Sequence, residues 1–171
     1  PTWVMKFLEN DIQDKNFLRY VVRFLKAGIF EDGSWTKSEQ GSPQGGLVSP
    51  VLANVYLHYV LDLWFEKKVK KELQGYAELV RYADDFVILL ERSEEAEEVY
   101  SALKKRLDKF GLSLSESKSQ MIPFGRKEWN RCQREGEKME SFDFLGLTHF
   151  GKRSRRGRFV LGRKTACSRM S

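Results

Sequence analysis

The stretch LVRYADDFVILL at residues 79–90 places two adjacent carboxylates, Asp84 and Asp85, between two apolar runs. Both runs are rich in β-favouring residues and predict the strands of a hairpin. Asp tolerates the backbone dihedrals of a tight turn, so both acids are expected at the tip. Taken alone, an Asp-Asp pair is more typical of an ordinary polar turn than of a site. The rest of the chain decides between the two interpretations.

The composition predicts a packed globular domain. The chain has 171 residues, of which 41% are hydrophobic and 13% aromatic, enough to bury roughly two thirds of the surface that the unfolded chain exposes. Its two cysteines, Cys132 and Cys167, lie far apart without metal-ligand spacing, so a disulfide framework is not expected and a reducing, cytoplasmic setting is. No run is apolar enough for a membrane span, and no signal peptide opens the chain. Because it starts at Pro1 without Met, we expect it to be a segment of a longer reading frame.

Positive charge is concentrated at the C-terminal end. The net charge is +6, yet residues 151–171 carry eight Lys or Arg and no acid, so the first 150 residues have a net charge of −2. A one-signed cluster favours a polyanionic partner, because phosphate backbones release counterions when they bind it. A solvated, disordered end is the alternative. The residues predicted to bind nucleic acid are Lys152, Arg153, Arg155, Arg156 and Arg158.

Apolar periodicity and turn residues predict an α+β fold. The first half of the chain is predicted to form two helices over 3–27 divided at 11–15, a short hairpin around Asp32-Gly33, and a helix over 50–71 with Ser49 as N-cap and Pro50 at its first position. The hairpin over 79–90 follows, and then a helix over 93–110 closed by Gly111. The remaining predictions are one or two strands within 112–122, a flexible connector over 125–140, and a β-rich segment over 142–150 that pairs with 159–161. Helix, antiparallel hairpin, helix and strand make up most of a split βαβ, ferredoxin-like unit whose first strand is absent.

Paired carboxylates at a hairpin tip are suited to divalent cations. Mg²⁺ prefers oxygen ligands and is usually held by one or two carboxylates together with substrate phosphates. Two such ions about 4 Å apart can activate an attacking hydroxyl and stabilise a leaving group in phosphoryl transfer. Asp84 and Asp85 supply too few ligands for two ions, so a third carboxylate is expected. The Gly-rich loop at 41–46 could hold a substrate through its backbone N–H groups.

Four motifs, in order, resemble those of reverse transcriptases. The tetrapeptide Tyr82-Ala83-Asp84-Asp85 resembles the active-site box of these enzymes, and residues 41–57, GSPQGGLVSPVLANVYL, resemble the matching upstream box of bacterial group II intron reverse transcriptases. Residues 112–118 are similar to the next motif and residues 142–147, FDFLGL, to the one after it. The tetrapeptide alone is a weak signal, but the ordered set covers nearly the whole chain. The chain is identified as a member of the group II intron reverse transcriptase/maturase family, as a palm-domain fragment.

The resemblance implies a palm domain that copies RNA into DNA with two Mg²⁺ ions, or Mn²⁺ in their place. It implies an RNA template (group II intron RNA), a DNA primer and dNTPs as partners. Asp84 is then the principal catalytic metal ligand and Asp85 assists it. The implied nucleotide-binding residues are Pro43, Gln44, Gly45, Gly46, Tyr82, Ala83 and Lys118, and the implied primer grip is Phe144, Leu145 and Gly146. Phe144 and Leu145 are equally compatible with ordinary core positions.

The resemblance also implies missing parts. In this family the first catalytic Asp lies on a strand just ahead of the helix with which this chain begins, and neither Asp11 nor Asp14 matches it. We therefore expect residues 1–150 to be a partial palm domain without its first catalytic strand, and residues 151–171 to be a basic β-hairpin leading into an absent thumb. Fingers are also expected to be absent. The isolated chain is predicted to be inactive, and its unpaired sheet edge predicts self-association.

Two other functions compete with polymerisation. A maturase or splicing factor could retain the palm fold for RNA binding alone, although family members often combine both roles. A nucleotide cyclase with a palm-like fold is a third possibility. The box at 43–45 and the segment at 144–146 argue against the cyclase.

Overall fold

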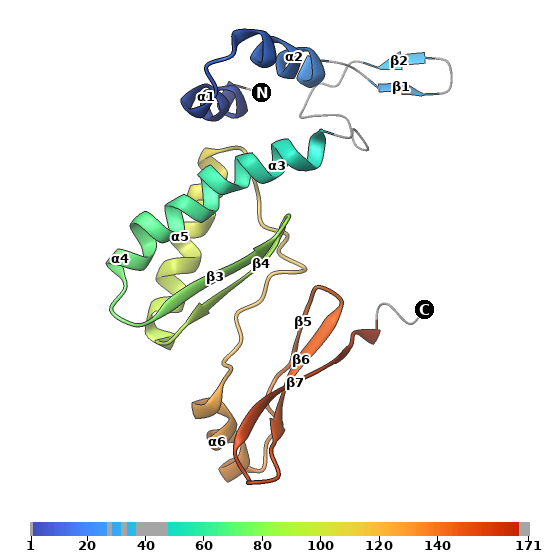
Figure 1. Cartoon of the computed structure of the whole chain (residues 1–171). Helices are drawn as coiled ribbons and strands as arrows, with labels where there is room; N and C mark the ends of the chain where they lie inside the picture. Colours follow the sequence, from blue (N-terminus) through green and yellow to red (C-terminus); the bar gives the residue numbers. More distant parts are fainter. Residues whose placement is uncertain (1, 27–28, 32–33, 37–47, 168–171) are drawn as a thin grey trace. The chain divides into compact units, whose positions relative to one another are not determined.

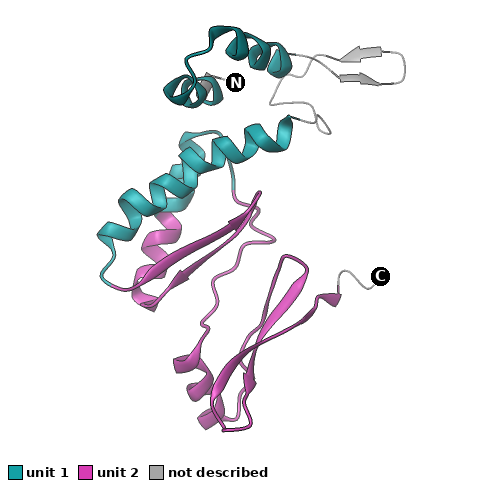
Figure 2. Cartoon of the chain, viewed as in Figure 1, with its two compact units in different colours: residues 1–74, 102–113 teal, residues 75–101, 114–171 magenta. Residues whose placement is uncertain are grey.

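The computed structural model describes residues 2–26, 29–31, 34–36 and 48–167. The chain forms two compact units, residues 1–74 with 102–113 and residues 75–101 with 114–171 (Figure 2). Helices and antiparallel strands occur in both, so the predicted α+β class is confirmed.

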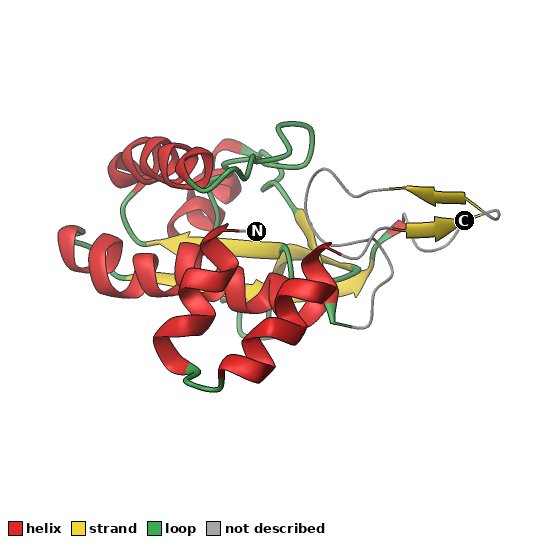
Figure 3. Cartoon of the chain, turned by 90° about the horizontal axis from the view of Figure 1, so that it is seen from above, coloured by secondary structure: helices red, strands yellow, loops and turns green. Residues whose placement is uncertain are grey.

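The first unit begins with a helical hairpin. Helices α1 (Thr2–Asp11) and α2 (Lys15–Lys26) are joined by a short turn (Figure 3). Asp14 caps α2, because its Oδ1 accepts hydrogen bonds from the backbone N–H groups of Asn16 and Phe17 at 2.8 and 3.2 Å. The division predicted at 11–15 is thereby confirmed. Leu8, Val21 and Leu25 of these two helices pack with Leu52 in one buried cluster.

The short hairpin predicted around residues 32–33 is also present. Strand β1 (Ile29–Glu31) pairs antiparallel with β2 (Ser34–Thr36). Pairing of Glu31 with Ser34 leaves two residues between the strands, the loop length that an Asp-Gly turn favours.

One long helical rod follows, but it is not a uniform α-helix. It runs through α3 (Ser49–Leu57), the π-helical turns η1 (His58–Asp62) and η2 (Phe65–Val69), and α4 (Lys70–Glu72). Its buried side chains, Leu52, Val60, Leu61, Phe65 and Val69, anchor it in the first unit. The prediction of Ser49 as N-cap was wrong. Val48 occupies that position with helical dihedrals and no side-chain cap, and Pro50 lies in the first turn.

A guanidinium group from α5 (Ala96–Lys109) contacts the first π-helical turn. Arg106 donates from Nε to the Val60 carbonyl at 2.9 Å and from Nη2 to the Tyr59 carbonyl at 3.2 Å. The same group lies 4.4 Å from the centroid of the Phe110 ring. Burial lowers the pKa of Arg106 below its ordinary value, but an arginine remains charged at neutral pH.

The predicted hairpin at 79–90 forms β3 (Ala77–Tyr82) and β4 (Asp85–Leu90), paired in register from Ala77 with Leu90 to Tyr82 with Asp85 (Figure 1). Side chains of directly paired residues share a face, so Tyr82 and Asp85 lie on the face that also carries Val80 and Leu89. Val80 and Leu89 are 44% and 48% exposed. The acidic face of the hairpin is therefore accessible, with apolar side chains beside the carboxylate.

Helix α5, preceded by the 3₁₀ turn η3 (Ser93–Glu95), matches the prediction over 93–110. It spans the boundary between the two units. Gly111 ends it with a φ of 70°, a value that glycine adopts readily. The predicted stripe is buried at Val99, Leu103, Leu107 and Phe110.

Two predictions after α5 were wrong. Residues 112–122 contain no strand in the described structure. Their backbone instead forms local turns, with Lys118 and Ser119 N–H groups donating to the Ser115 carbonyl. Residues 125–140 are not an irregular connector either, because they contain α6 (Arg126–Glu135).

The remaining strands form a three-stranded antiparallel sheet of β5 (Phe142–Phe144), β6 (Leu147–Arg153) and β7 (Phe159–Thr165). Pairing of Arg153 with Phe159 confirms the predicted hairpin across the basic turn. The domain boundary predicted between residues 150 and 151 falls within β6, and the domain assignment stays a prediction. No helix of the described residues is long and apolar enough to cross a membrane.

Candidate active site

The tip of the β3–β4 hairpin is a two-residue turn, Ala83-Asp84, closed by the Tyr82–Asp85 pair. Ala83 has a φ of 53°, and Asp84 is not among the residues with positive φ. A positive φ at the first turn position alone matches a type II′ turn, where glycine is usual. We expected the acids to take the unusual backbone conformation, but the alanine takes it. Arg81 stabilises the turn by donating from Nη1 to the Ala83 carbonyl at 2.7 Å.

Asp84 and Asp85 are both exposed. Within the part of the chain that the structure describes, neither carboxylate has a hydrogen-bond or ion-pair partner, so all four oxygens are available. Available carboxylate oxygens suit a hard divalent cation such as Mg²⁺. The described residues contain no cluster of three or more His, Cys, Asp or Glu side chains that could hold a metal, so the pair supplies two carboxylates there.

A second strained turn lies at the segment predicted to grip a primer. Leu145 and Gly146 have φ values of 52° and 74°, and Phe144 pairs with Leu147 around them. Positive φ at both central positions is the type I′ geometry, which usually takes Asn-Gly. Leu145 is 43% exposed and therefore is not a core residue, whereas Phe144 is half-buried.

Replacement of Leu145 tests the strain in this turn. A left-handed conformation costs a residue with a Cβ roughly 1 kcal/mol, and Asn tolerates it better than Leu. Leu145→Asn is therefore expected to raise the free energy of unfolding by about 0.5–1 kcal/mol, measured by urea denaturation. The matched control is Leu147→Asn, on the extended strand β6 and 37% exposed. An equal change in both variants would contradict strain as the cause.

The other predicted nucleotide-binding residues are not assembled by described contacts. Pro43, Gln44, Gly45 and Gly46 lie outside the described residues. Tyr82 is 68% exposed beside Asp85. Lys118 is exposed in the local turn after α5, and no described contact joins it to either carboxylate.

The described part of the basic end, up to residue 167, contains the β6–β7 hairpin. Residues 152–158 close the β6–β7 hairpin, where the Ser154 N–H donates to the Arg158 carbonyl at 2.8 Å. Gly157 turns the chain with a φ of 76°. The five basic residues predicted to bind nucleic acid, Lys152, Arg153, Arg155, Arg156 and Arg158, are all exposed. The sequence prediction left out Arg163 and Lys164, two further exposed cations of β7 whose signal was their place in the same one-signed run.

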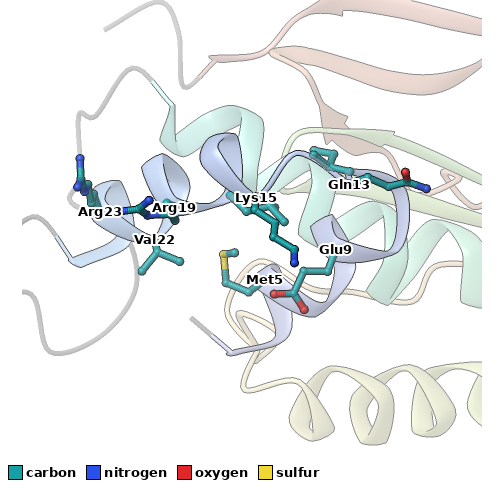
Figure 4. Close-up of a pocket in the computed structure, with 9 residues that line it drawn as sticks. Met5, Glu9, Gln13, Lys15, Arg19, Val22 and Arg23 are labelled. Atoms are coloured by element: carbon teal, nitrogen blue, oxygen red, sulfur yellow. The ribbon is translucent and has the colours of Figure 1, made fainter.

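The first unit contains an open groove that no sequence motif indicated. It has a volume of about 770 Å³ and lies between α1 and α2, with an apolar floor that includes Met5 and Val22. Lys15, Arg19 and Arg23 line it from α2 (Figure 4). None of the predicted site residues lines this groove.

Comparison with known proteins places the chain in a family. Residues 4–149 match the model of the "Reverse transcriptase (RNA-dependent DNA polymerase)" family. The group II intron-encoded protein LtrA of Lactococcus lactis is 41% identical over 59 residues, which are 34% of this chain and 10% of LtrA. The putative COX1/OXI3 intron 1 protein of Saccharomyces cerevisiae is 39% identical over 87 residues, 46% of this chain and 10% of that protein. Protein YkfC of Escherichia coli is 28% identical over 112 residues, 51% of this chain and 29% of YkfC.

The chain thus spans about a tenth of the length of the intron-encoded relatives. The family match, in contrast, covers most of the chain and includes both strained turns, the paired carboxylates and Lys118. The resemblance to group II intron proteins that the sequence motifs predicted is confirmed by these relatives. The chain belongs to the reverse transcriptase (RNA-dependent DNA polymerase) family.

Proposed function

We propose that this chain is the palm part of an RNA-directed DNA polymerase of a mobile group II intron, with a partial split βαβ sheet. The observation that carries the proposal is the pair of free, exposed carboxylates, one in a strained two-residue turn and one on the strand residue that closes it. A type II′ turn needs no acids for its own formation, and an alanine there is unfavourable. Conformational strain of this kind is concentrated at functional sites.

Asp84 and Asp85 are the residues that would hold Mg²⁺, or Mn²⁺ in its place. A bound divalent cation supplies Lewis-acid stabilisation of the charge on a transferring phosphoryl group. The chain contributes a defined backbone position for both residues, because the Tyr82–Asp85 pair and the Arg81 hydrogen bond hold the turn. We place the third carboxylate of the site outside this chain.

The substrates follow from the same assignment. Pro43, Gln44, Gly45 and Gly46 are proposed to line the site of the incoming dNTP, with Tyr82, Ala83 and Lys118. The turn at 144–146 is proposed to contact the DNA primer, and the template is group II intron RNA. Strands β3 and β4 pair only with each other in the described structure, so their free edges favour self-association. A cytoplasmic location is proposed with these partners.

Primer extension tests the proposal. The open reading frame that encodes the chain, expressed from start codon to stop codon, is expected to extend a DNA primer on an RNA template with Mg²⁺. The 171-residue chain alone is expected to give no extension, because two carboxylates are too few for two ions. Extension by the isolated chain would contradict the partial site, and absence of extension by the complete frame would contradict the polymerase assignment.

The exposed cations of the β6–β7 hairpin favour RNA binding as a second role, the one a maturase requires. Arg155→Gln with Arg156→Gln is expected to weaken binding of a single-stranded RNA about tenfold at low salt. The slope of log affinity against log salt should fall by about 1.4, because each lost phosphate contact removes about 0.7 for single strands. Fluorescence anisotropy measures both quantities.

A matched control removes two exposed cations from α6, by Arg126→Gln with Lys127→Gln. Its net charge equals that of the hairpin variant, so equal losses in both would indicate a nonspecific effect of charge. A loss confined to the hairpin variant supports the assignment.

A further inference from the structure

The second unit encloses a cavity at the base of the β6–β7 hairpin. It has a volume of about 510 Å³, within the range of small-molecule sites. Its walls come from α6, from the segment that follows α6, and from both strands of the hairpin. The side chains that carry the inference are Lys138, Phe150 and Lys164.

Two aromatic rings line the cavity from fixed positions. Trp129 packs against Gly151, because a Cβ added to Gly151 would lie 2.6 Å from the Trp129 ring. The centroid of the Trp129 ring is 5.9 Å from the centroid of the Phe159 ring. The Phe150 ring lies over Gly162, whose added Cβ would be 2.7 Å from two of its atoms. The two glycines thus leave the space that the rings occupy. Because Phe150 pairs with Gly162 and Gly151 is the next residue of β6, the two rings lie on opposite faces of the strand, and the Phe150 ring shares its face with Lys164. Neither Trp129 nor Phe150 is fully buried, so each retains accessible surface.

Two ammonium groups border the same cavity. Lys164 is exposed on β7, and its Nζ lies 6.0 Å from the centroid of the Phe150 ring. Lys138 is exposed on the segment after α6. Neither lysine has an ion-pair partner among the described residues.

One carboxylate also lines the cavity, but it is paired. Glu137 accepts a hydrogen bond from Nη1 of Arg131 at 2.9 Å. The same guanidinium binds Glu128, with Nη2 at 2.6 Å from Oε1, and contacts Glu135. These hydrogen bonds hold the pKa of Glu128 below its ordinary value and raise that of Arg131. The acids are therefore turned toward Arg131, and the two lysines are the unpaired charges of the wall.

The cavity ends next to the basic residues of the hairpin. Gly151 lines it, and Lys152 and Arg153 follow directly on β6. Phe150 and Arg153 are separated by about 10 Å along an extended strand. A nucleic-acid strand whose phosphates contact the hairpin therefore passes within reach of the cavity.

We propose that this cavity binds one nucleotide, with its base against the Phe150 ring and its phosphate paired with Lys138 and Lys164. A ligand for this wall needs a flat aromatic part and an anionic part. Base–aromatic stacking and phosphate–lysine pairing are the interactions by which single strands are held. The source is either a free nucleotide or an unstacked nucleotide of the RNA strand, and the second source rests on the RNA-binding role proposed above.

Titration of the 171-residue chain tests the site. The probes are adenosine monophosphate, ribose 5-phosphate and a 12-nucleotide single-stranded RNA. Isothermal titration calorimetry measures binding of the two small molecules, and fluorescence anisotropy measures binding of the RNA. We expect the monophosphate to bind at least tenfold more tightly than ribose 5-phosphate, because only the monophosphate has a base. Lys138→Gln with Lys164→Gln is expected to weaken monophosphate binding at least tenfold.

Phe150→Leu, which keeps an apolar side chain over Gly162, is expected to weaken binding of the monophosphate but not binding of ribose 5-phosphate. The charge-matched control is Lys105→Gln with Lys127→Gln, two exposed lysines away from the cavity. Far-ultraviolet circular dichroism establishes that each variant is folded. Equal binding of monophosphate and ribose 5-phosphate, or equal losses in the cavity and control variants, would overturn the proposal.

The RNA measurements distinguish a free nucleotide from a nucleotide of an RNA strand as the ligand. They also distinguish failure of the cavity proposal from failure of the RNA-binding role. If both cavity variants weaken RNA binding, the pocket holds a nucleotide of the strand. If monophosphate binds and RNA binding does not depend on the cavity, the pocket serves free nucleotides. If RNA binding depends on Arg155 and Arg156 while monophosphate does not bind, the pocket is rejected and the RNA-binding role stands. If nothing binds, both are rejected.

Discussion

Asp84→Asn is expected to lower the kcat of primer extension by the complete reading frame about a thousandfold. A metal ion at such a site contributes several kcal/mol to stabilisation of the transition state, and each 1.36 kcal/mol corresponds to a factor of ten in rate. Asn retains the size of the side chain and is well tolerated in turns, so the hairpin should remain intact. The loss should appear in kcat, with KM for the dNTP changed much less, since the ligand acts mainly in the transition state.

The control for this experiment is Asp108→Asn, which removes an exposed carboxylate from α5. It should retain extension within twofold. Asp85→Asn is expected to have a smaller effect than Asp84→Asn, in keeping with its assisting role. Extension by Asp84→Asn within tenfold of the unmodified protein would refute the assignment of Asp84 as the principal metal ligand.

Arg106→Met is expected to lower the free energy of unfolding by about 2–4 kcal/mol. The change removes two hydrogen bonds from a charged donor to the Tyr59 and Val60 carbonyls, and a hydrogen bond to a charged group contributes about 1.5–3 kcal/mol. It also removes the cation that lies 4.4 Å from the Phe110 ring centroid. Met retains most of the aliphatic volume, so loss of packing contributes little. Thermal unfolding should show a fall in Tm of about 5–10 °C.

Lys105→Met is the matched control, because it is the neighbouring residue of α5 and is exposed. It should change stability by less than about 0.5 kcal/mol. Arg106→Lys should recover part of the loss, since an ammonium group reaches one carbonyl but lacks the planar fork. Equal effects of Arg106→Met and Lys105→Met would show that the two carbonyls have other donors.

Sequence patterns correctly predicted the elements whose apolar and turn residues follow a regular local pattern. The β3–β4 hairpin follows from two β-favouring runs around an acidic turn, and α5 from its buried stripe closed by Gly111. Helix α6 was missed because it is strongly polar and has little apolar periodicity. It is held instead by Trp129 and the buried Cys132 on one side and by the Arg131 ion pairs on the other. Those ion pairs include Glu137, which lies beyond the helix.

The position of the paired acids at the end of the hairpin was predictable, but the backbone conformation of the turn was not. The tetrapeptide placed Asp84 and Asp85 at the hairpin tip, where the structure has them. Nothing in the sequence indicates a positive φ at Ala83 or Leu145, because both residues disfavour it and the strand register imposes it. The cavity beside β6 was equally hidden. It depends on the strand pairing that sets Gly162 opposite Phe150, and on the packing of Trp129 from α6 against Gly151.

The two π-helical turns between Ser49 and Glu72 determine where relatives can differ in length by one residue. Hydrogen bonds there span five residues instead of four, so each turn accommodates one residue more than an α-helix of the same phase. A relative that lacks one residue within His58–Asp62 could keep a regular α-helix with Phe65 still facing the core. The same deletion within Ser49–Leu57 would rotate the preceding part of the helix by about 100°. Single-residue length variation is therefore expected at the wide turns and excluded from α3.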